Sequence, residues 1–414
     1  MTDPLLRPKR KNPVLATRMP TLPPGARSRA ALGLTAAAAE GRFALQACAD
    51  CGALQYPPRE ACHRCLGARL RWRTQDGAGT LLAETTLHHS NDLFFRERLP
   101  WRLGMVRLDA GPTVVAHLHG DVRGAGTRLQ VGARLDRAGQ AVLVALPEKE
   151  TPNMSDDPQL REMTCDPKFR KVLVTDAKTA LGQAVVHALV AAGADIVWAG
   201  HAEPWKRLPG FDGLAALPQV TPVPLDLTDS RSVVELAGEI GGKVDIVVNT
   251  AEHHRAAGIG ARVAVETARN EMDINYFGLL RLAQAFGPAL RARAADGPAG
   301  ACAWVNLLSI YALANFPSHG TFSASKAAAL SLAQCLRAEM RPAGVRVVNL
   351  FPGPIDDAWN QLTPPPKVAP EQLAKAVVGA LRDGVEDVYP GDVAQEWLER
   401  WRDNPKALER EIGG

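Results

Sequence analysis

Six short apolar runs, each separated from the next by an Ala- and Leu-rich helical stretch, dominate the second half of the chain. They are KVLVTD from Lys171, ADIVWAG from Ala194, VTPVPLDL from Val220, VDIVVNT from Val244, CAWVNLLS from Cys302 and VRVVNLFPG from Val345. Largely apolar runs of this length are typical of strands buried on both faces of a sheet. The alternation of strand and helix predicts an α/β doubly wound (Rossmann-type) parallel-sheet domain over residues 169–414.

Bulk properties restrict the class of protein further. The 414 residues suffice for two or three domains, and a net charge of +4 is too mild to indicate a polyanionic partner. No apolar run approaches the length of a membrane-spanning helix, and the N-terminal MTDPLLRPKRKNP has no hydrophobic signal core. We therefore expect a cytoplasmic protein without a membrane partner, whose seven cysteines are metal ligands or buried thiols.

Four of those cysteines form two Cys-x-x-Cys knuckles. Cys48-Ala-Asp-Cys51 is followed, after a gap of ten residues, by Cys62-His-Arg-Cys65. This spacing can supply four thiolates to one tetrahedral metal ion, and Gly52 permits the tight turn that aims backbone N–H groups at sulfur. Four thiolates close the coordination shell, so the site is predicted to be structural. Zinc is the expected ion, and iron in a rubredoxin-like site is the alternative.

The rest of the first half divides by composition. Residues 1–27 are Pro-rich and basic, which predicts a flexible arm or, alternatively, a segment that wraps a partner. A short helix with Ser28 as a candidate N-cap is expected to precede the knuckles, giving a helix-and-ribbon domain over residues 28–68. Short strands and turns predict a small β-barrel over residues 69–146. Residues 147–168 are polar and lack a hydrophobic period, which indicates a linker.

Within this half, CADCG, YPPR from Tyr56, CHRC, Trp72 and GAGT from Gly77 resemble the OB-fold family with a rubredoxin-like zinc ribbon, also called domain of unknown function thirty-five. The resemblance covers roughly residues 40–147. It implies an acyl-CoA-associated accessory protein that works with a thiolase-like or aldolase-like enzyme and its acyl-CoA substrates.

OB-type barrels also bind single-stranded nucleic acid, usually by stacking bases on aromatic side chains over a basic groove. The candidate aromatic residues here are few: Trp72, Phe94, Phe95 and Trp101. Nucleic acid is therefore not the expected partner. Phe94, Phe95 and Trp101 flank a charged loop and either form a lip for a ligand or partner or pack in the core.

The segment from Val305 to Lys326 resembles the active site of the short-chain dehydrogenase/reductase family, in which Ser, Tyr and Lys follow a Ser…Tyr-x-x-x-Lys pattern. Ser309 and Lys326 match, and Asn275 matches the helix Asn that supports the family's proton relay. Phe322 occupies the Tyr position, where a phenyl ring has no proton to transfer. The three matching residues are thus expected to be vestigial. Tyr311 is either a surrogate proton donor or a packed aromatic residue.

The family's cofactor loop, Thr-Gly-x-x-x-Gly-x-Gly, is degenerate in this chain. It reads Thr175-Asp176-Ala-Lys178-Thr-Ala180-Leu-Gly182, so only the last glycine remains. Ala180 adds a Cβ where a pyrophosphate would approach. Asp176 adds a carboxylate, and like charges at ~4 Å in an effective dielectric of ~20 cost on the order of 4 kcal/mol. Lys178 would offset part of this cost. Alternatively, Asp176 caps the helix N-terminus in place of a phosphate.

Further family positions are partly kept. Asp226 matches the residue that contacts adenine, and Gly353 belongs to a matching Pro-Gly pair. Asn249 opens Asn-Thr-Ala-Glu where the family has Asn-Asn-Ala-Gly, which places Glu252 at a glycine position. Asp357 stands where a hydroxyl residue is expected near the nicotinamide amide. If a dinucleotide binds through these residues together with Thr175, Lys178 and Gly182, then His201 and Lys178 favour NADP(H), but the departures make such binding doubtful.

These departures concentrate on dinucleotide and proton-donor positions, whereas the scaffold signals persist. They predict an accessory or scaffold subunit of an acyl-CoA-processing complex with a catalytically impaired reductase domain. Its amphipathic helices after Asn270 and Ser323 are expected to hold a catalytic reductase subunit or a second copy. The alternative is an active NADP(H)-dependent 3-ketoacyl-CoA/3-hydroxyacyl-CoA oxidoreductase with a rearranged proton donor. A nucleic-acid-binding or purely regulatory protein is the third hypothesis.

Overall fold

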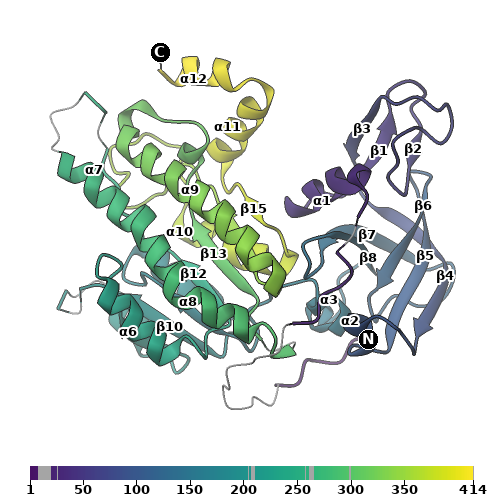
Figure 1. Cartoon of the computed structure of the whole chain (residues 1–414), viewed down its shortest axis with the longest axis horizontal. Helices are drawn as coiled ribbons and strands as arrows, with labels where there is room; N and C mark the ends of the chain where they lie inside the picture. Colours follow the sequence, from purple (N-terminus) through teal and green to yellow (C-terminus); the bar gives the residue numbers. More distant parts are fainter. Residues whose placement is uncertain are drawn as a thin grey trace. The chain divides into compact units, whose positions relative to one another are not determined.

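A computed structural model describes residues 1–7, 20–25, 27–203, 205–206, 210–256, 258–260, 265–297 and 300–413. The chain divides into two compact units with separate cores (Figure 1). The first unit is built mainly from residues 20–166 and the second mainly from residues 167–381 and 386–414. Lys9, Arg10 and Lys11 of the predicted arm lie outside the described residues.

The first unit opens with a helix and a small antiparallel sheet. A 3-10 turn, η1 (Arg29–Ala31), continues into α1 (Leu32–Ala39), so the predicted helix is present. Ser28 occupies the N-cap position of η1, as predicted, but its side chain makes no capping hydrogen bond. The strands β1 (Ala44–Cys48), β2 (Leu54–Gln55) and β3 (Leu70–Thr74) pair in the order β2-β1-β3 and form the ribbon that carries the cysteines.

Five strands close the predicted barrel. They are β4 (Ala78–Leu87), β5 (Trp101–Leu108), β6 (Thr113–Leu118), β7 (Arg128–Leu135) and β8 (Ala141–Pro147), arranged in the order β4-β5-β6-β8-β7. β6 and β8 pair in parallel, and the other neighbouring strands pair antiparallel. Along β7 buried and partly exposed residues alternate, as expected of a strand with one face in a barrel interior.

The segment that was expected to be a linker is folded onto the barrel. It contains the 3-10 turn η2 (Met154–Asp156) and the short helix α3 (Pro158–Arg161). Leu160 and Met163 pack in one apolar cluster with Phe94 of α2 (Leu93–Arg96) and Trp101. Two apolar side chains three residues apart are too weak a pattern to reveal this packing in the sequence.

The second unit is centred on a seven-stranded parallel sheet. Its strands are β9 (Lys171–Val174), β10 (Ile196–His201), β11 (Val220–Pro224), β12 (Ile246–Asn249), β13 (Ala303–Leu307), β14 (Arg346–Leu350) and β15 (Asp387–Val388), in the order β11-β10-β9-β12-β13-β14-β15. The first six coincide with the six apolar runs, so the doubly wound sheet is confirmed. The chain moves outward from β9 to β11 and then returns to β12, which places the topological switch point between β9 and β12.

Helices connect these strands and complete the core. They are α4 (Ala180–Ala191), α5 (Phe211–Ala215), α6 (Ser230–Ile240), α7 (Val265–Met272), α8 (Leu279–Arg293), α9 (Gly320–Met340), α10 (Pro370–Asp383), α11 (Asp392–Asp403) and α12 (Pro405–Gly413). A π-helical turn, η3 (Asp273–Gly278), joins α7 to α8. In the part of the chain that the structure describes, no helix has the length and apolarity needed to cross a bilayer.

Gly77 is a position where the barrel requires glycine. Its φ is +84°, and a Cβ on Gly77 would lie 1.9 Å from the carbonyl oxygen of Val131. Gly126 has a similar φ of +88° but meets nothing within 4 Å. We expect Gly77→Ala to destabilise the protein by more than the roughly 1–2 kcal/mol that left-handed backbone costs an L-residue, and Gly126→Ala by about that amount only. Thermal unfolding followed by calorimetry measures the difference, and equal losses would contradict the steric argument.

Candidate functional site

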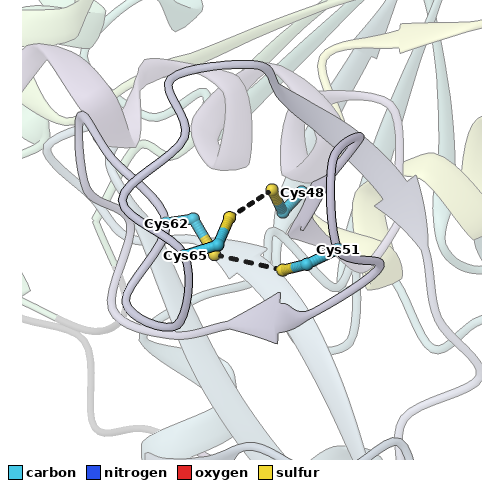
Figure 2. A group of neighbouring side chains, drawn as sticks. All are labelled: Cys48, Cys51, Cys62 and Cys65. Carbon is cyan, nitrogen blue, oxygen red and sulfur yellow. Dashed lines mark hydrogen bonds between the residues drawn. The ribbon is translucent and has the colours of Figure 1, made fainter.

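The four predicted ligand cysteines meet at one point of the ribbon. Their sulfur atoms all lie within 4.8 Å of one another, and Figure 2 shows Cys48 facing Cys65 and Cys51 facing Cys62. The Sγ–Sγ distances in these two pairs are 3.5 and 3.6 Å. A tetrahedral zinc ion with Zn–S bonds of ~2.3 Å separates its sulfur ligands by about 3.8 Å. The thiol set therefore fits a four-coordinate zinc ion.

The backbone around the cysteines is arranged as a metal knuckle requires. The backbone N–H of Asp50 donates to Cys48 Sγ and that of Arg64 donates to Cys62 Sγ, each over 3.4 Å. Gly52 has a φ of +73°, and its N–H donates to the carbonyl of Cys48 over 2.9 Å. Gly52 thus permits the turn that was expected of it, while the donors to sulfur come from its neighbours.

In the second unit, the structure brings the reductase-type residues together at the carboxyl edge of the sheet. Ser309 follows β13, and its Oγ accepts from the N–H of Tyr311 and donates to the carbonyl of Pro352. Asn275 lies in η3, where its side chain donates to the carbonyl of His253 over 2.9 Å and accepts from the N–H of the same residue over 3.0 Å. Such a backbone clamp holds the start of the loop after β12 in place.

Lys326 is engaged by a partner that the sequence did not reveal. Its Nζ lies 2.7 Å from a carboxylate oxygen of Glu252 and donates to the carbonyl of Leu307 over 3.0 Å. The Lys326 side chain is 1% exposed and that of Glu252 is 10% exposed. A buried lysine needs a compensating charge, and Glu252 supplies it. The acidic residue at the family's glycine position therefore neutralises the retained lysine.

Phe322 is covered by a second unforeseen residue, His254. Their rings stack with centroids 3.8 Å apart, and both side chains are 2% exposed. Burial lowers the pKa of His254 to about 4, so the imidazole is neutral at pH 7. Within the described residues, neither ring nitrogen of His254 has a hydrogen-bond partner. The face of Phe322 is thereby closed off by an aromatic ring.

Tyr311 is held in an aromatic cluster. Its ring stacks on Phe316 with a centroid distance of 5.1 Å and lies 5.5 Å from the ring of Trp397. Burial raises the pKa of its phenol above the ordinary value, which makes the group a weaker acid. This environment favours the packed-aromatic interpretation over the surrogate-donor interpretation.

The space left among these residues is small. A cavity of about 10 Å³ lies among them. Its lining consists of Glu252, His254, Leu308, Ser309, Tyr311, Phe322, Asn360 and the segment Pro352–Ile355. A water molecule needs roughly 10–15 Å³ of such volume, so the cavity has room for about one water. Asp357 lies beside it and accepts from Asn360, and burial raises the pKa of its carboxyl.

The polar side chains of the loop after β9 make hydrogen bonds within the protein. The Asp176 carboxylate accepts from the N–H of Lys178 over 3.2 Å, and burial raises the pKa of this carboxyl. Thr179, whose hydroxyl accepts from the N–H of Gly182, is the N-cap of α4, so Asp176 is not the helix cap that was considered. Lys178 is 8% exposed and donates to the carbonyls of Glu203 and Lys206.

The remaining candidate cofactor residues have structural partners. The Thr175 hydroxyl donates to the side-chain oxygen of Asn249 over 2.8 Å, which ties β9 to β12. The Asp226 carboxylate accepts from the backbone and hydroxyl of Thr228. A Cβ on Gly182 would lie 1.9 Å from the carbonyl oxygen of Asp176, and one on Gly353 would lie 3.0 Å from Val393 of α11. Packing within the protein thus requires glycine at position 182, and at position 353 it leaves a larger residue only tight space.

The fold and the residues gathered at the carboxyl edge define a Rossmann-type oxidoreductase domain, preceded by a zinc ribbon and an OB-type barrel. Residues 170–365 match the short chain dehydrogenase family. Residues 35–71 match the rubredoxin-like zinc ribbon domain of ChsH2, and residues 72–140 match its C-terminal OB-fold domain. The chain belongs to the short chain dehydrogenase family, with ChsH2-type ribbon and barrel domains fused to the reductase domain.

Similar proteins agree with this assignment. An uncharacterized oxidoreductase of Staphylococcus aureus (strain USA300) is 30% identical over 215 residues, which span 50% of this chain and 89% of the relative. A short chain dehydrogenase from Burkholderia cenocepacia J2315, solved in complex with NADP, is 35% identical with a TM-score of 0.54 over 60% of this chain and 98% of its own. A short-chain dehydrogenase from Streptomyces avermitilis is 25% identical with a TM-score of 0.50, over 58% and 96%.

The thiolate cluster predicts that the ribbon depends on its metal. We expect Cys62→Ser to lose most of the bound zinc and to lower the unfolding temperature, because classical zinc ribbons derive folding energy from the ion. Cys335, which is exposed and distant in sequence, provides the control. Cys335→Ser should retain one zinc per chain by elemental analysis. Unchanged zinc content in Cys62→Ser would contradict the assignment.

The buried His254 predicts a specific pH dependence of stability. Its folded pKa of about 4 lies below the ordinary imidazole value of 6.5, so the unfolded state binds the proton first as the pH falls. The contribution is therefore fully present above pH ~6.5 and is lost progressively toward pH ~4. We expect His254→Phe, which cannot take up this proton, to unfold at a higher urea concentration than the parent, by a margin that grows from pH 7 to pH 5. His187→Phe, at an exposed site, should leave the margin constant.

Proposed function

We propose that the chain is an accessory subunit of an acyl-CoA-processing complex in which its reductase-type domain acts as a scaffold and not as a hydride-transfer catalyst. The observation that carries this proposal is the buried Glu252–Lys326 ion pair, in which the carboxylate lies 2.7 Å from the lysine Nζ. Glu252 thereby engages the lysine that the family pattern retains.

Two further features support the loss of hydride transfer. Phe322 has no proton to donate, and removing a general acid typically lowers the rate by about 10²–10⁴. In the cofactor loop, the Asp176 carboxylate accepts from a backbone N–H that lies where a pyrophosphate would be received. An anionic ligand would have to displace this carboxylate and then lie close to it.

The ribbon and barrel support a proposal for the kind of partner enzyme. Their ChsH2-type domains resemble acyl-CoA-associated accessory proteins, which supports a thiolase-like or aldolase-like enzyme as partner. Helices α8 and α9 are offered as the surface for a catalytic reductase subunit or a second copy, by analogy with the way this fold family pairs its subunits.

The second candidate function is NADP(H)-dependent reduction of 3-ketoacyl-CoA substrates. It is favoured by the 35% identity to the Burkholderia protein, whose structure contains NADP, and by the retained Ser309, Lys326 and Asn275. Such an enzyme would need a proton donor other than Phe322.

Calorimetric titration of the zinc-loaded full chain with NADPH and NADH separates the two functions. We expect no heat and no thermal shift at millimolar dinucleotide, because Glu252 is paired with Lys326 and Asp176 adds a carboxylate to the phosphate loop. Glu252→Gly removes the side chain from the expected nicotinamide site. The control Glu252→Gln keeps the size of that side chain and removes its negative charge. Micromolar binding by the unmodified chain, together with NADPH-dependent reduction of acetoacetyl-CoA, would overturn the scaffold proposal.

The accessory role has its own test. A tagged full chain purified from its native host should carry 3-ketoacyl-CoA thiolysis or aldol-cleavage activity, and Cys62→Ser should lose that activity together with its zinc. A chain that purifies alone and without either activity would contradict the proposed complex.

A further inference from the structure

The first unit contains a cavity on the outer side of the barrel wall that no role described so far explains. It measures about 130 Å³ and lies among α2, β5, β6, β8 and the segment after α3. Its lining is mostly apolar and consists of Pro23, Pro24, Arg27, Phe94, Phe95, Trp101, His117, Asp136, Val142, Glu162 and Met163. An engineered protein cavity of about 150 Å³ is known to bind benzene, so this volume suits a six-membered ring.

Aromatic rings form a fixed wall of the cavity. Phe95 contacts Phe94 and Trp101 edge to face, with centroid distances of 5.2 and 5.3 Å, and Trp101 contacts His117 in the same way at 5.5 Å. Asp92 caps α2 by accepting from the backbone N–H groups of Phe94 and Phe95. Edge-to-face packing is a favoured arrangement of aromatic rings, and a flat ligand ring can add to it. The wall is therefore formed before any ligand arrives.

His117 gives the cavity one hydrogen-bond donor. The indole Nε1–H of Trp101 donates to His117 Nδ1 over 2.8 Å, and an indole N–H can only donate. Burial lowers the pKa of His117 to about 4, so the ring is neutral at pH 7 and carries its single proton on Nε2. A neutral acceptor such as a carbonyl oxygen can receive this N–H.

Both acidic groups of the lining are paired with arginines, one inside the lining and one outside it. Asp136 lies 3.7 Å from Arg27, and Glu162 lies 3.0 Å from Arg98, whose guanidinium covers the outer face of Phe94 at 3.9 Å from its centroid. Asp136, Arg27 and Glu162 are thus each paired with an opposite charge, so a charged ligand would lose its hydration without gaining an unpaired counter-charge in the lining. The lining thus selects for an uncharged ligand. Pro24 and Arg27 are the exposed lining residues and mark the side that faces solvent.

We propose that this cavity binds an uncharged ring of benzene size that carries a carbonyl group, with the carbonyl oxygen accepting from His117 Nε2 and the ring lying against Phe95 and Trp101. Such binding is independent of whether the second unit transfers hydride. It also gives a reason for Phe94, Phe95 and Trp101 to border a cavity and not only to fill the core.

Three probes of similar shape test the site by calorimetry on the zinc-loaded full chain. Acetophenone has the ring and the carbonyl, α-methylstyrene replaces the carbonyl by a carbon–carbon double bond, and benzoate carries a negative charge. We expect acetophenone to bind, α-methylstyrene to bind roughly fivefold more weakly for want of one hydrogen bond, and benzoate to bind most weakly. Absence of heat with both neutral probes up to millimolar concentration would overturn the proposal.

Variants assign the binding to this cavity. Val142→Phe fills the space and should abolish acetophenone binding, whereas Val115→Phe, at a 55% exposed position on β6, should not change it. His117→Met has no N–H to donate and keeps a weak sulfur acceptor for Trp101, so acetophenone and α-methylstyrene should then bind equally. Unchanged acetophenone affinity in Val142→Phe, or an unchanged preference in His117→Met, would refute the site.

Benzoyl-CoA distinguishes the source of the ring. Its displacement of acetophenone from the unmodified chain, and not from Val142→Phe, would assign the cavity to rings borne on a thioester. Failure to displace acetophenone that does bind would assign it to free aryl ketones.

Discussion

Parallel strands buried on both faces present their carboxyl ends at the same edge of the sheet, and the second unit is organised by this constraint. It delivers Thr175, Asn249 and Ser309 to one edge, where their polar side chains are enclosed by the loops that follow the strands. Enclosed polar groups must find hydrogen-bond partners, because leaving one unpaired costs on the order of 1–3 kcal/mol. In a dinucleotide-binding protein the ligand can supply some of those partners. In this chain Thr175 bonds to Asn249, and Ser309 bonds to the backbone of Tyr311 and Pro352.

The departures from the family pattern are therefore coupled to one another through the structure. Glu252 balances the charge of Lys326, His254 covers Phe322, and Asp176 takes up a backbone N–H of its own loop. Each contact involves a residue at which this chain departs from the family pattern, namely Glu252, Phe322 or Asp176. A group of residues that satisfy one another in this way keeps the fold intact without a ligand, and this self-sufficiency is the physical basis for regarding the domain as a scaffold.

Much of the fold could be predicted from the sequence. Six strands appear as largely apolar runs, and the spacing of the four cysteines alone predicts their metal site. By contrast, β15 has two residues, and α3 docks through Leu160 and Met163, so neither leaves a periodic signal. The pairing of Glu252 with Lys326 joins residues far apart in sequence, and the stacking of His254 on Phe322 does the same. Glu252 was recognisable as a departure, but its partner depends on where the loop after β12 meets α9. The cavity beside Phe95 needs the packing of several separate segments and has no sequence signature.

The buried pair of Glu252 and Lys326 also bears on how this domain can evolve. Removing one member of a buried ion pair strands the other charge and typically costs about 3–5 kcal/mol, a large share of the stability of most domains. A single change of Glu252 to glycine would therefore leave Lys326 buried without its counter-charge and lower the stability of the domain, although not necessarily its ability to fold. Changes at these two positions are therefore coupled, and a substitution at one is best tolerated together with a compensating change at the other.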